Sequence, residues 1–555
     1  MPKIEVSRQD LFRLSRLKDP GDAELANLLT LVKGEIDQSL GDELKIELND
    51  TNRPDLWCVE GVARILRCSE NGPENHLSSM SADHMSITVD PGIQAIRPYI
   101  AGFRATGWKL DQEGLDSLLI VQEKLSESYG KKRSRTAIGF HRAKEIAFPV
   151  CYVSAETEEL MEPLGYEEKM SLSRILTDTE KGREYAHLLA GFTQYPVLTD
   201  TNGVIFSFPP ILNSNTTGKV CQGDDDLFCD VTGTDWETVQ LTATMLACNL
   251  EDHGAIITPV DVLYSYDVPY PAREVVTPVL FADCMSVTKD EIKKVLGIDM
   301  SLETAREALQ RMDYASVEID GDTLKGTLPP YRRDGIHAVD MIEDIVISIG
   351  LESFEPLLPE QFTIGHSAPV EELVDAVRTV LIGAGCEEIL RPVLTSLRKI
   401  KGITRTPKAP VIIANPMTEE YGVIRNTLLP GLLDVESTSA HASYPHRMFE
   451  SGEVLISGDD GLCRTEIHLA GFVCGNKADF GDVHSILGSI CFSRDLDLSL
   501  ISVEDERFIS GRCATVMVNG KASGVIGEFH PAVLTEWGIT RPASGFEISI
   551  DSLKE

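Results

Sequence analysis

Four carboxylate side chains crowd one short stretch of the chain, Tyr331–Gly350. Asp340, Glu343 and Asp344 follow the i, i+3, i+4 spacing of one helix face, and Asp334 lies six residues upstream of that helix. Like charges held close together are unfavourable unless a cation or protons neutralise them, and all-oxygen ligands suit a hard ion such as Mg²⁺. Spacing alone leaves a second interpretation open, because the helix dipole also favours a solvated acidic first turn.

The element that would position these carboxylates is a helix running from Asp340 towards Gly350. Ile342, Ile345 and Ile349 recur at helical spacing and form a stripe that we expect to be buried. Gly350 is a suitable residue for the end of the helix.

A second group of candidate residues is basic. The segment between Tyr129 and Lys144 contains the densest positive cluster of the chain: Lys131, Lys132, Arg133, Arg135, Arg142 and Lys144. Such a cluster could contact an RNA backbone. As a loop it could equally be a solvated face that balances the charge of an acidic protein.

Length and charge limit the possible functions. The chain has 555 residues and a net charge of −36, which predicts three to five domains and, overall, a poor nucleic-acid binder. Its twelve cysteines show no zinc-binding spacing, so we expect free thiols in a reducing cytosol. There is no signal sequence and no apolar run long enough for a membrane span.

Local patterns predict further elements. Leu44, Ile46 and Leu48 alternate as in a half-buried strand, and a helix is expected to follow the turn at Asn49–Pro54, capped by Asp55. An Asn-Gly turn at Asn202–Gly203 should join two strands.

Between about 270 and 352, two helices precede a hairpin at Asp320–Gly321 and then the acidic helix, an order typical of a winged helix. Thr288 and Glu291 fit a capping box for the first helix, with Gly297 at its end. DNA binding is disfavoured because a basic recognition face is missing.

Four stretches in the same chain order resemble one known family. They are LNDTNRPDLWCVEGVARIL (48–66), YPVLTDTNGVIFSFPPILNSNTTGKV (195–220), PPYRRDGIHAVDMIEDIVISIG (329–350) and the segment 415–455, which contains IRNTLLPGLL and FESGEVL. All four are similar to the β subunit of phenylalanyl–tRNA synthetase. The family's bacterial members carry additional domains for which this chain is too short, so the archaeal/eukaryotic type is expected.

The resemblance implies a multidomain α+β fold with four parts. These are an N-terminal α/β structural module (1–83), an α/β tRNA-editing domain (84–268), a winged-helix-like Mg-binding module (269–352) and a degenerate class II synthetase-like antiparallel-sheet domain (353–555). The last part lacks a motif 3 arginine, so aminoacylation is not expected on this chain.

The resemblance also implies site residues. The PPYR-x-D…H-x-x-D-x-x-E-[DE] pattern would bind Mg²⁺ through Asp334, Asp340, Glu343 and Asp344. The editing pocket would be lined by Leu198, Ser207 and Asn213, with Asp230 and Thr232 close by. Phe206 stands where the family usually has Leu. His141 is a conceivable base there, although a lone histidine is more often a surface or core hydrogen-bonding residue.

The expected function is that of the β subunit in an (αβ)₂ phenylalanine–tRNA ligase. The α subunit would use ATP and phenylalanine, and this chain would hydrolyse misacylated Tyr-tRNA(Phe) in the cytoplasm, without contact with a membrane or DNA. Two alternatives remain: a free-standing trans-editing hydrolase, and a non-enzymatic winged-helix scaffold.

Overall fold

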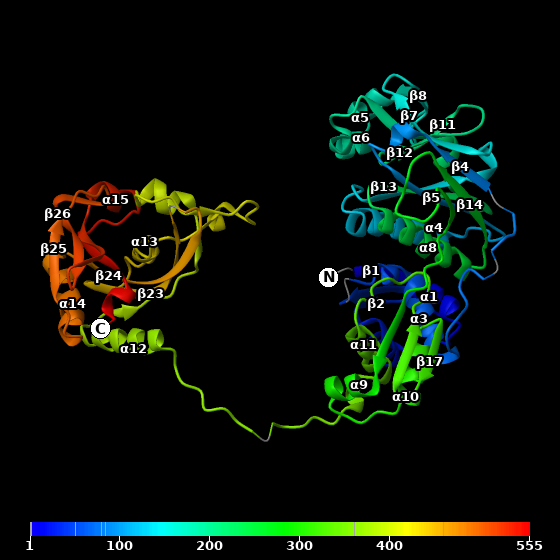
Figure 1. Ribbon diagram of the computed structural model, residues 1–555. Coiled ribbons are helices and arrows are strands. Elements are labelled where there is room, and N and C mark those ends of the chain that lie inside the picture. Colours follow the sequence, from blue (N-terminus) through cyan, green and yellow to red (C-terminus); the bar gives the residue numbers. More distant parts are fainter. Residues whose placement is uncertain are drawn as a thin grey trace. The chain divides into compact units, whose positions relative to one another are not determined.

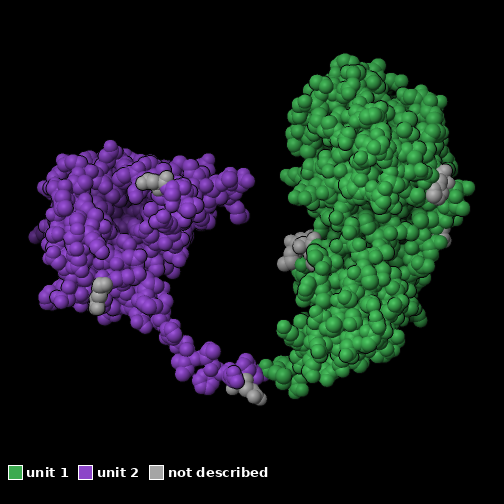
Figure 2. Space-filling model, viewed as in Figure 1, with its two compact units in different colours: residues 1–357 green, residues 358–555 purple. Residues whose placement is uncertain are grey.

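The protein is a multidomain mixed α/β chain made of two compact units, residues 1–357 and 358–555 (Figure 2). The computed structural model describes residues 3–49, 52–78, 80–83, 85–359, 361–458 and 460–554. The first unit contains the first three expected domains, so their boundaries at 83 and 268 remain predictions. Among the described residues, no helix is long and apolar enough to cross a membrane, and all twelve cysteines are free thiols.

The N-terminal part is a three-stranded antiparallel sheet of order β1-β3-β2 with three helices. The strand predicted from Leu44 to Leu48 is confirmed, and its three leucine and isoleucine side chains are fully buried. The predicted cap at Asp55 is wrong, because the helix begins at Val59 and Asp55 instead accepts hydrogen bonds from Arg53. Residues 50 and 51 of the expected turn lie outside the described residues. The elements are β1 (Lys3–Ser7), α1 (Arg8–Ser15), α2 (Asp22–Leu29), β2 (Gly34–Leu40), β3 (Glu43–Leu48) and α3 (Val59–Asn71).

A ten-stranded mixed sheet forms the second part, with the order β12-β11-β10-β7-β4-β14-β5-β13-β6 and β15 paired to β14. The Asn202–Gly203 turn joins β10 to β11 as predicted. The strand expected from residue 84 begins at Met85; residue 84 itself is outside the described residues. Helix α8 packs against β5 and β13 (Figure 1).

The strands of this sheet are β4 (Met85–Val89), β5 (Tyr99–Thr106), β6 (Thr136–Arg142), β7 (Val150–Glu156), β10 (Gln194–Thr199), β11 (Ile205–Phe208), β12 (Leu212–Asn213), β13 (Asp226–Gly233), β14 (Ile256–Tyr264) and β15 (Glu274–Thr277). A small hairpin and five helices accompany it: β8 (Leu160–Met161), β9 (Met170–Ser171), α4 (Gln112–Lys124), α5 (Leu172–Asp178), α6 (Glu180–Tyr185), α7 (Asn215–Gly218) and α8 (Trp236–Asp252).

The third part has the predicted order of helix, helix, hairpin and helix. A strand that the sequence patterns did not predict, β16, precedes them and pairs with β18, giving the sheet order β16-β18-β17. The capping box of Thr288 and Glu291 and the helix end at Gly297 are both confirmed. The elements are β16 (Cys284–Thr288), α9 (Lys289–Leu296), α10 (Leu302–Arg311), β17 (Ser316–Asp320), β18 (Thr323–Thr327) and α11 (Ala338–Ile349).

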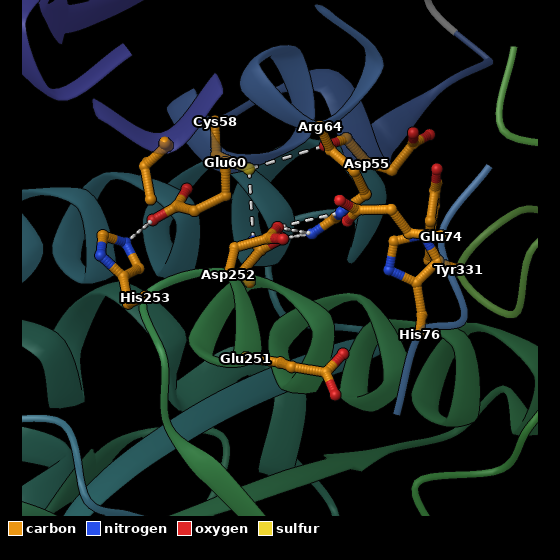
Figure 3. Close-up of polar contacts among 12 residues, drawn as sticks. Asp55, Cys58, Glu60, Arg64, Glu74, His76, Glu251, Asp252, His253 and Tyr331 are labelled. Carbon is orange, nitrogen blue, oxygen red and sulfur yellow. Dashed lines mark hydrogen bonds and ion pairs between the residues drawn. The ribbon is translucent and has the colours of Figure 1, made fainter. Parts of the chain in front are cut away.

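Buried ion pairs join the N-terminal part to the ten-stranded sheet. Figure 3 shows Arg64 on α3 facing Asp252 at the end of α8, with Nε and Oδ2 2.9 Å apart. Arg67 donates to the other oxygen of Asp252 at 2.6 Å. Glu60 and His253 form a second contact between the same two parts, at 2.9 Å. These charged side chains are almost completely buried, so the ion pairs hold the two parts in one arrangement.

The second unit is built on a seven-stranded sheet of order β19-β23-β24-β28-β27-β26-β25. Alternate residues of β24 face opposite cores: Leu469 and Val473 pack with helices α12 and α14, whereas Ala470 and Phe472 pack with α13 and α15. The elements are α12 (Pro369–Gly383), β19 (Glu387–Glu388), β20 (Leu394–Thr395), β21 (Val411–Ile412), β22 (Val423–Ile424), α13 (Leu429–Thr438), β23 (His446–Ser457), β24 (Cys463–Cys474), α14 (Phe480–Ser493), β25 (Leu498–Ser502), β26 (Phe508–Val518), β27 (Lys521–Phe529), α15 (Pro531–Glu536) and β28 (Ala543–Ser549).

Candidate active site in the ten-stranded sheet

A pocket of about 490 Å³ opens where the two opposite edges of the sheet approach each other, β11 and β12 on one side and β13 and β6 on the other. Three residues expected from the resemblance line it: Ser207, Asn213 and Asp230. The rest of its wall is partly apolar and partly charged, from residues including Leu119, Gln122, Glu127, Arg133, Leu164, Lys181, Glu184, Tyr185, Pro209 and Pro210. The structure therefore brings residues from four strands into one polar cavity.

Strand register explains how these residues meet. Asp230 on β13 lies directly opposite Gly139 on β6, so both point to the same face of the sheet. A Cβ atom at position 139 would lie 2.4 Å from Asp230 Oδ1, so the carboxylate occupies space that only glycine leaves free. Ser207 lies opposite Asn213, and its hydroxyl donates to Asn213 Oδ1 at 3.2 Å. The Asn213 amide nitrogen donates to the Phe140 carbonyl at 3.3 Å.

Two of the expected residues lie behind the pocket. Leu198 is opposite Ser207 in the register, but its side chain is fully buried in the core that contains Phe206 and Phe228. Leu198 therefore shares a sheet face with Ser207 but is covered by other side chains, and its role in an editing pocket stays a prediction. Thr232 is also fully buried, and its hydroxyl accepts a hydrogen bond from Arg97 at 3.0 Å. Thr232 and Asp230 are two residues apart on β13, so the two residues are close together, as expected.

The sequence patterns missed a charged wall made by α6, the helical turn that follows α4 and the loop before β6. The guanidinium of Arg133 lies over the ring of Tyr185, 4.2 Å from its centre, and donates to the Pro210 and Ile211 carbonyls at 3.0 and 2.8 Å. The Tyr185 hydroxyl donates to Glu127, and burial together with this bond raises the pKa of Tyr185. Because Tyr185 is more than fifty residues from Arg133, only a tertiary contact could identify this wall.

The basic segment divides into two roles. Lys131, Lys132 and Arg135 are exposed, whereas Arg133 is turned into the pocket wall. Lys131, Lys132 and Arg133 all have left-handed φ angles, of 48°, 52° and 62°. Three consecutive residues in this region are strained, and such strain persists only where surrounding contacts fix the backbone. Here Arg97 provides one such contact by donating to the Arg133 carbonyl at 3.1 Å.

His141 does not reach the cavity. Its side chain is fully buried, and its Nε2 atom lies 2.6 Å from Asp230 Oδ1. Of the two interpretations offered by the sequence, the structure therefore agrees with the core hydrogen-bonding residue.

The four acidic residues expected to bind Mg²⁺ do not converge. The buried Arg332 forms ion pairs with two of them. Its Nη2 atom lies 2.7 Å from Asp334 Oδ2 and 3.0 Å from Asp344 Oδ2. Asp340 accepts hydrogen bonds from the backbone N–H groups of residues 336 and 337, each at 2.7 Å. Glu343 forms an ion pair with Lys33 of the N-terminal part, also at 2.7 Å.

The described structure does not gather the four carboxylates into the expected metal site, which stays a prediction. Within the described ranges, no group of three or more His, Cys, Asp or Glu side chains could hold a metal ion. The physical reason is charge compensation: Arg332 already neutralises two of the carboxylates, and the pairing lowers the pKa of Asp334 despite its burial. The donor set of this chain, as folded here, does not fit a bound Mg²⁺.

Replacing Asp340 should reveal a helix cap and no metal site. The structure makes Asp340 part of a capping box at the start of α11, so Asp340→Ala should cost about 1 kcal/mol of stability. The loss should be the same with Mg²⁺ and with a chelator when thermal unfolding is followed. If Asp340→Ala lost thermal stability only in the presence of Mg²⁺, the result would instead support a metal site at Asp340.

Comparison with known proteins identifies the family. Residues 285–351 match the model of the tRNA synthetase B5 domain, and residues 356–550 match that of the phenylalanyl tRNA synthetase beta chain CLM domain. The phenylalanine–tRNA ligase beta subunit of Borrelia hermsii is 34% identical over all of both chains. That of Thermococcus gammatolerans is 36% identical over 100% of this chain and 99% of its own.

A solved structure from the same family is also similar to this chain. The N-terminal fragment of the phenylalanyl-tRNA synthetase beta subunit from Pyrococcus horikoshii is 35% identical, with a TM-score of 0.59, and covers 63% of this chain and 99% of the fragment. The protein therefore belongs to the β-subunit family of phenylalanine–tRNA ligase and serves in the formation of Phe-tRNA.

Proposed function

We propose that the pocket between the two edges of the ten-stranded sheet hydrolyses misacylated Tyr-tRNA(Phe). The observation that carries the proposal is the meeting of Ser207, Asn213 and Asp230 in a single cavity. A hydroxyl, an amide and a carboxylate together can hold a water molecule next to the ester that joins tyrosine to the tRNA. An activated ester needs only modest help from a positioned water, and no nucleophilic side chain is required.

Selection for tyrosine has a physical basis in a second, polar pocket. An apolar pocket rejects an added hydroxyl by only about 100-fold, whereas a site that hydrogen-bonds the hydroxyl can select it by about 10⁴-fold. The cavity offers several partners for a phenol, among them the Ser207–Asn213 pair and the Glu127 side of the charged wall. Leu119 and Leu164 contribute exposed apolar surface that an aromatic ring could cover.

The proposal assigns amino-acid activation to an α subunit in an (αβ)₂ assembly. ATP and Mg²⁺ would be used there, in the cytoplasm, and tRNA(Phe) would contact the exposed Lys131, Lys132 and Arg135. The second unit would act as the α-binding, degenerate class II domain, and residues 269–352 as a winged-helix module. Exposed apolar side chains around the small β20–β22 sheet support a docking role, because large ones are costly to leave in water: Leu390, Leu394, Ile412, Met417 and Tyr421.

The experiment that tests the pocket uses the αβ complex with Asn213→Ala. This change removes the amide that orients Ser207, so hydrolysis of preformed Tyr-tRNA(Phe) should slow by about tenfold while formation of Phe-tRNA(Phe) keeps its rate. The exposed Asn202→Ala in the β10–β11 turn is the matched control and should change neither rate. Equal loss of both activities in Asn213→Ala would place the hydrolytic site elsewhere.

A free-standing editing hydrolase is the remaining alternative. Such a protein would cleave Tyr-tRNA(Phe) equally well with and without the α subunit. The proposal instead predicts that the purified chain binds an α subunit, and that aminoacylation requires both chains.

A further inference from the structure

A chain of buried hydrogen bonds lies directly behind the pocket. His141 Nε2 donates to Asp230 Oδ1 at 2.6 Å, and His141 Nδ1 lies 3.1 Å from the Thr217 hydroxyl. The Thr217 hydroxyl in turn lies 2.9 Å from the hydroxyl of Ser214. All four side chains are at most 3% exposed, and of the four only Asp230 lines the cavity.

We propose that His141 is a positioning residue that fixes the carboxylate of Asp230 for hydrolysis; this inference rests on the function proposed above. A carboxylate held at one oxygen by a charge-assisted bond cannot rotate about its last torsion without breaking that bond. The second oxygen then keeps one orientation towards the cavity, where it can align a water molecule or the ammonium group of the aminoacyl ester.

The hydrogen-bond chain also selects one form of the imidazole. With Nε2–H donating to Asp230, a neutral ring accepts at Nδ1, and the Thr217 hydroxyl is placed to donate there. Thr217 can accept from Ser214, whose oxygen also receives the backbone N–H of Thr217 at 3.2 Å and so begins α7. The Thr217 hydroxyl has a second possible acceptor in the Phe206 carbonyl, but that contact is longer, at 3.4 Å, than the one to Nδ1.

Packing leaves the ring no other position. The ring of Phe206 meets the imidazole edge-on, with centres 5.1 Å apart, and Phe228 lies on a second side at 6.1 Å. On the third side, a Cβ atom at Gly139 would lie 2.9 Å from His141 Nε2. Since the ring has no contact with solvent, it cannot itself take a proton from a water in the cavity, and its action on the reaction passes through Asp230.

Two substitutions that each imitate one ring nitrogen test this role. The amide nitrogen of glutamine reaches the place of Nε2, whereas that of asparagine reaches only the place of Nδ1. In the αβ complex, His141→Gln should therefore keep the kcat of Tyr-tRNA(Phe) hydrolysis within about threefold of wild type. His141→Asn should lower kcat by about 100-fold with little change in KM, because the carboxylate is left unfixed.

A purely structural role would give another pattern. The proposal would be overturned if His141→Gln and His141→Asn hydrolysed the ester at equal rates. It would also be overturned if the two rates differed only as the thermal stabilities of the variants differ. Should either variant fail to fold, His141→Leu removes both ring nitrogens at a side chain that does not line the cavity. It should lower kcat about 100-fold, as His141→Asn does, and an unchanged kcat would overturn the proposal as well.

Failure of this inference can be told apart from failure of the proposed function. A wild-type complex that leaves Tyr-tRNA(Phe) intact would refute both. Hydrolysis that is lost in Asp230→Asn but kept at the wild-type rate in both His141 variants would refute the positioning role alone.

Discussion

Asp230→Asn should lower the rate of Tyr-tRNA(Phe) hydrolysis by the αβ complex by at least about 100-fold, the range expected when a group that assists proton transfer is lost. The side chain keeps its shape, so the strand pairing with Gly139 should survive. However, the amide cannot accept a proton from water, and His141 would face either a weaker acceptor or a second donor.

The control for this prediction is the synthetic activity of the same preparation. Formation of Phe-tRNA(Phe) should stay within about twofold of wild type, because the pocket lies in the first unit and activation is assigned to the α subunit. The measurement is the decay of preformed Tyr-tRNA(Phe), with substrate turnover followed at saturating and at low concentration. A wild-type hydrolysis rate in Asp230→Asn would remove this carboxylate from the mechanism.

Asp252→Ala should destabilise the first unit by about 3–5 kcal/mol, since the buried Arg64 loses its carboxylate partner and the buried Arg67 loses one of two. Arg64 and Arg67 share the two oxygens of Asp252, and all three side chains are at most 5% exposed. Removing the carboxylate leaves the buried Arg64 guanidinium with the Asn249 amide oxygen at 2.8 Å as a neutral partner (Figure 3). Arg67 loses one of its two carboxylate partners and keeps Glu74 at 2.6 Å. The measurement is the free energy of unfolding of the first unit, followed in denaturant.

An exposed ion pair provides the matched comparison. Asp267 pairs with Arg273 at 2.8 Å, but the Asp267 side chain is 87% exposed. Asp267→Ala should therefore cost less than about 1 kcal/mol. If Asp252→Ala and Asp267→Ala lowered the free energy of unfolding by the same amount, burial would not explain the strength of the contact between α3 and α8.

The sequence could predict elements wherever local periodicity was strong. The alternation of Leu44, Ile46 and Leu48 and the capping box of Thr288 and Glu291 depend on neighbours within a few residues, and both were confirmed. The start of α3 was predicted three residues too early, because Asp55 resembles a helix cap but binds Arg53 instead, and the residue at the cap position is Cys58. A local pattern cannot show which of two partners a carboxylate prefers.

Predictions that depended on distant partners were less reliable. The acidic stretch was expected to need a cation, and the structure supplies one as Arg332 from the same motif, with Lys33 reaching Glu343 from more than three hundred residues away. In the pocket, Ser207, Asn213 and Asp230 followed from the resemblance, whereas the wall of Arg133 and Tyr185 depends on how the loop before β6 packs against α6. Side-chain partners across the fold are set by tertiary packing, which no spacing rule encodes.

The most direct test of a separate editing pocket is to compare two esters on the same tRNA. The purified αβ complex, given neither ATP nor free amino acid, should hydrolyse Tyr-tRNA(Phe) about 100-fold or more faster than Phe-tRNA(Phe), because the polar cavity can bind the phenol hydroxyl. The account predicts that this preference belongs to the first unit of the β chain and disappears in Asp230→Asn. Equal hydrolysis of the two esters, or a preference that persists in that variant, would contradict it.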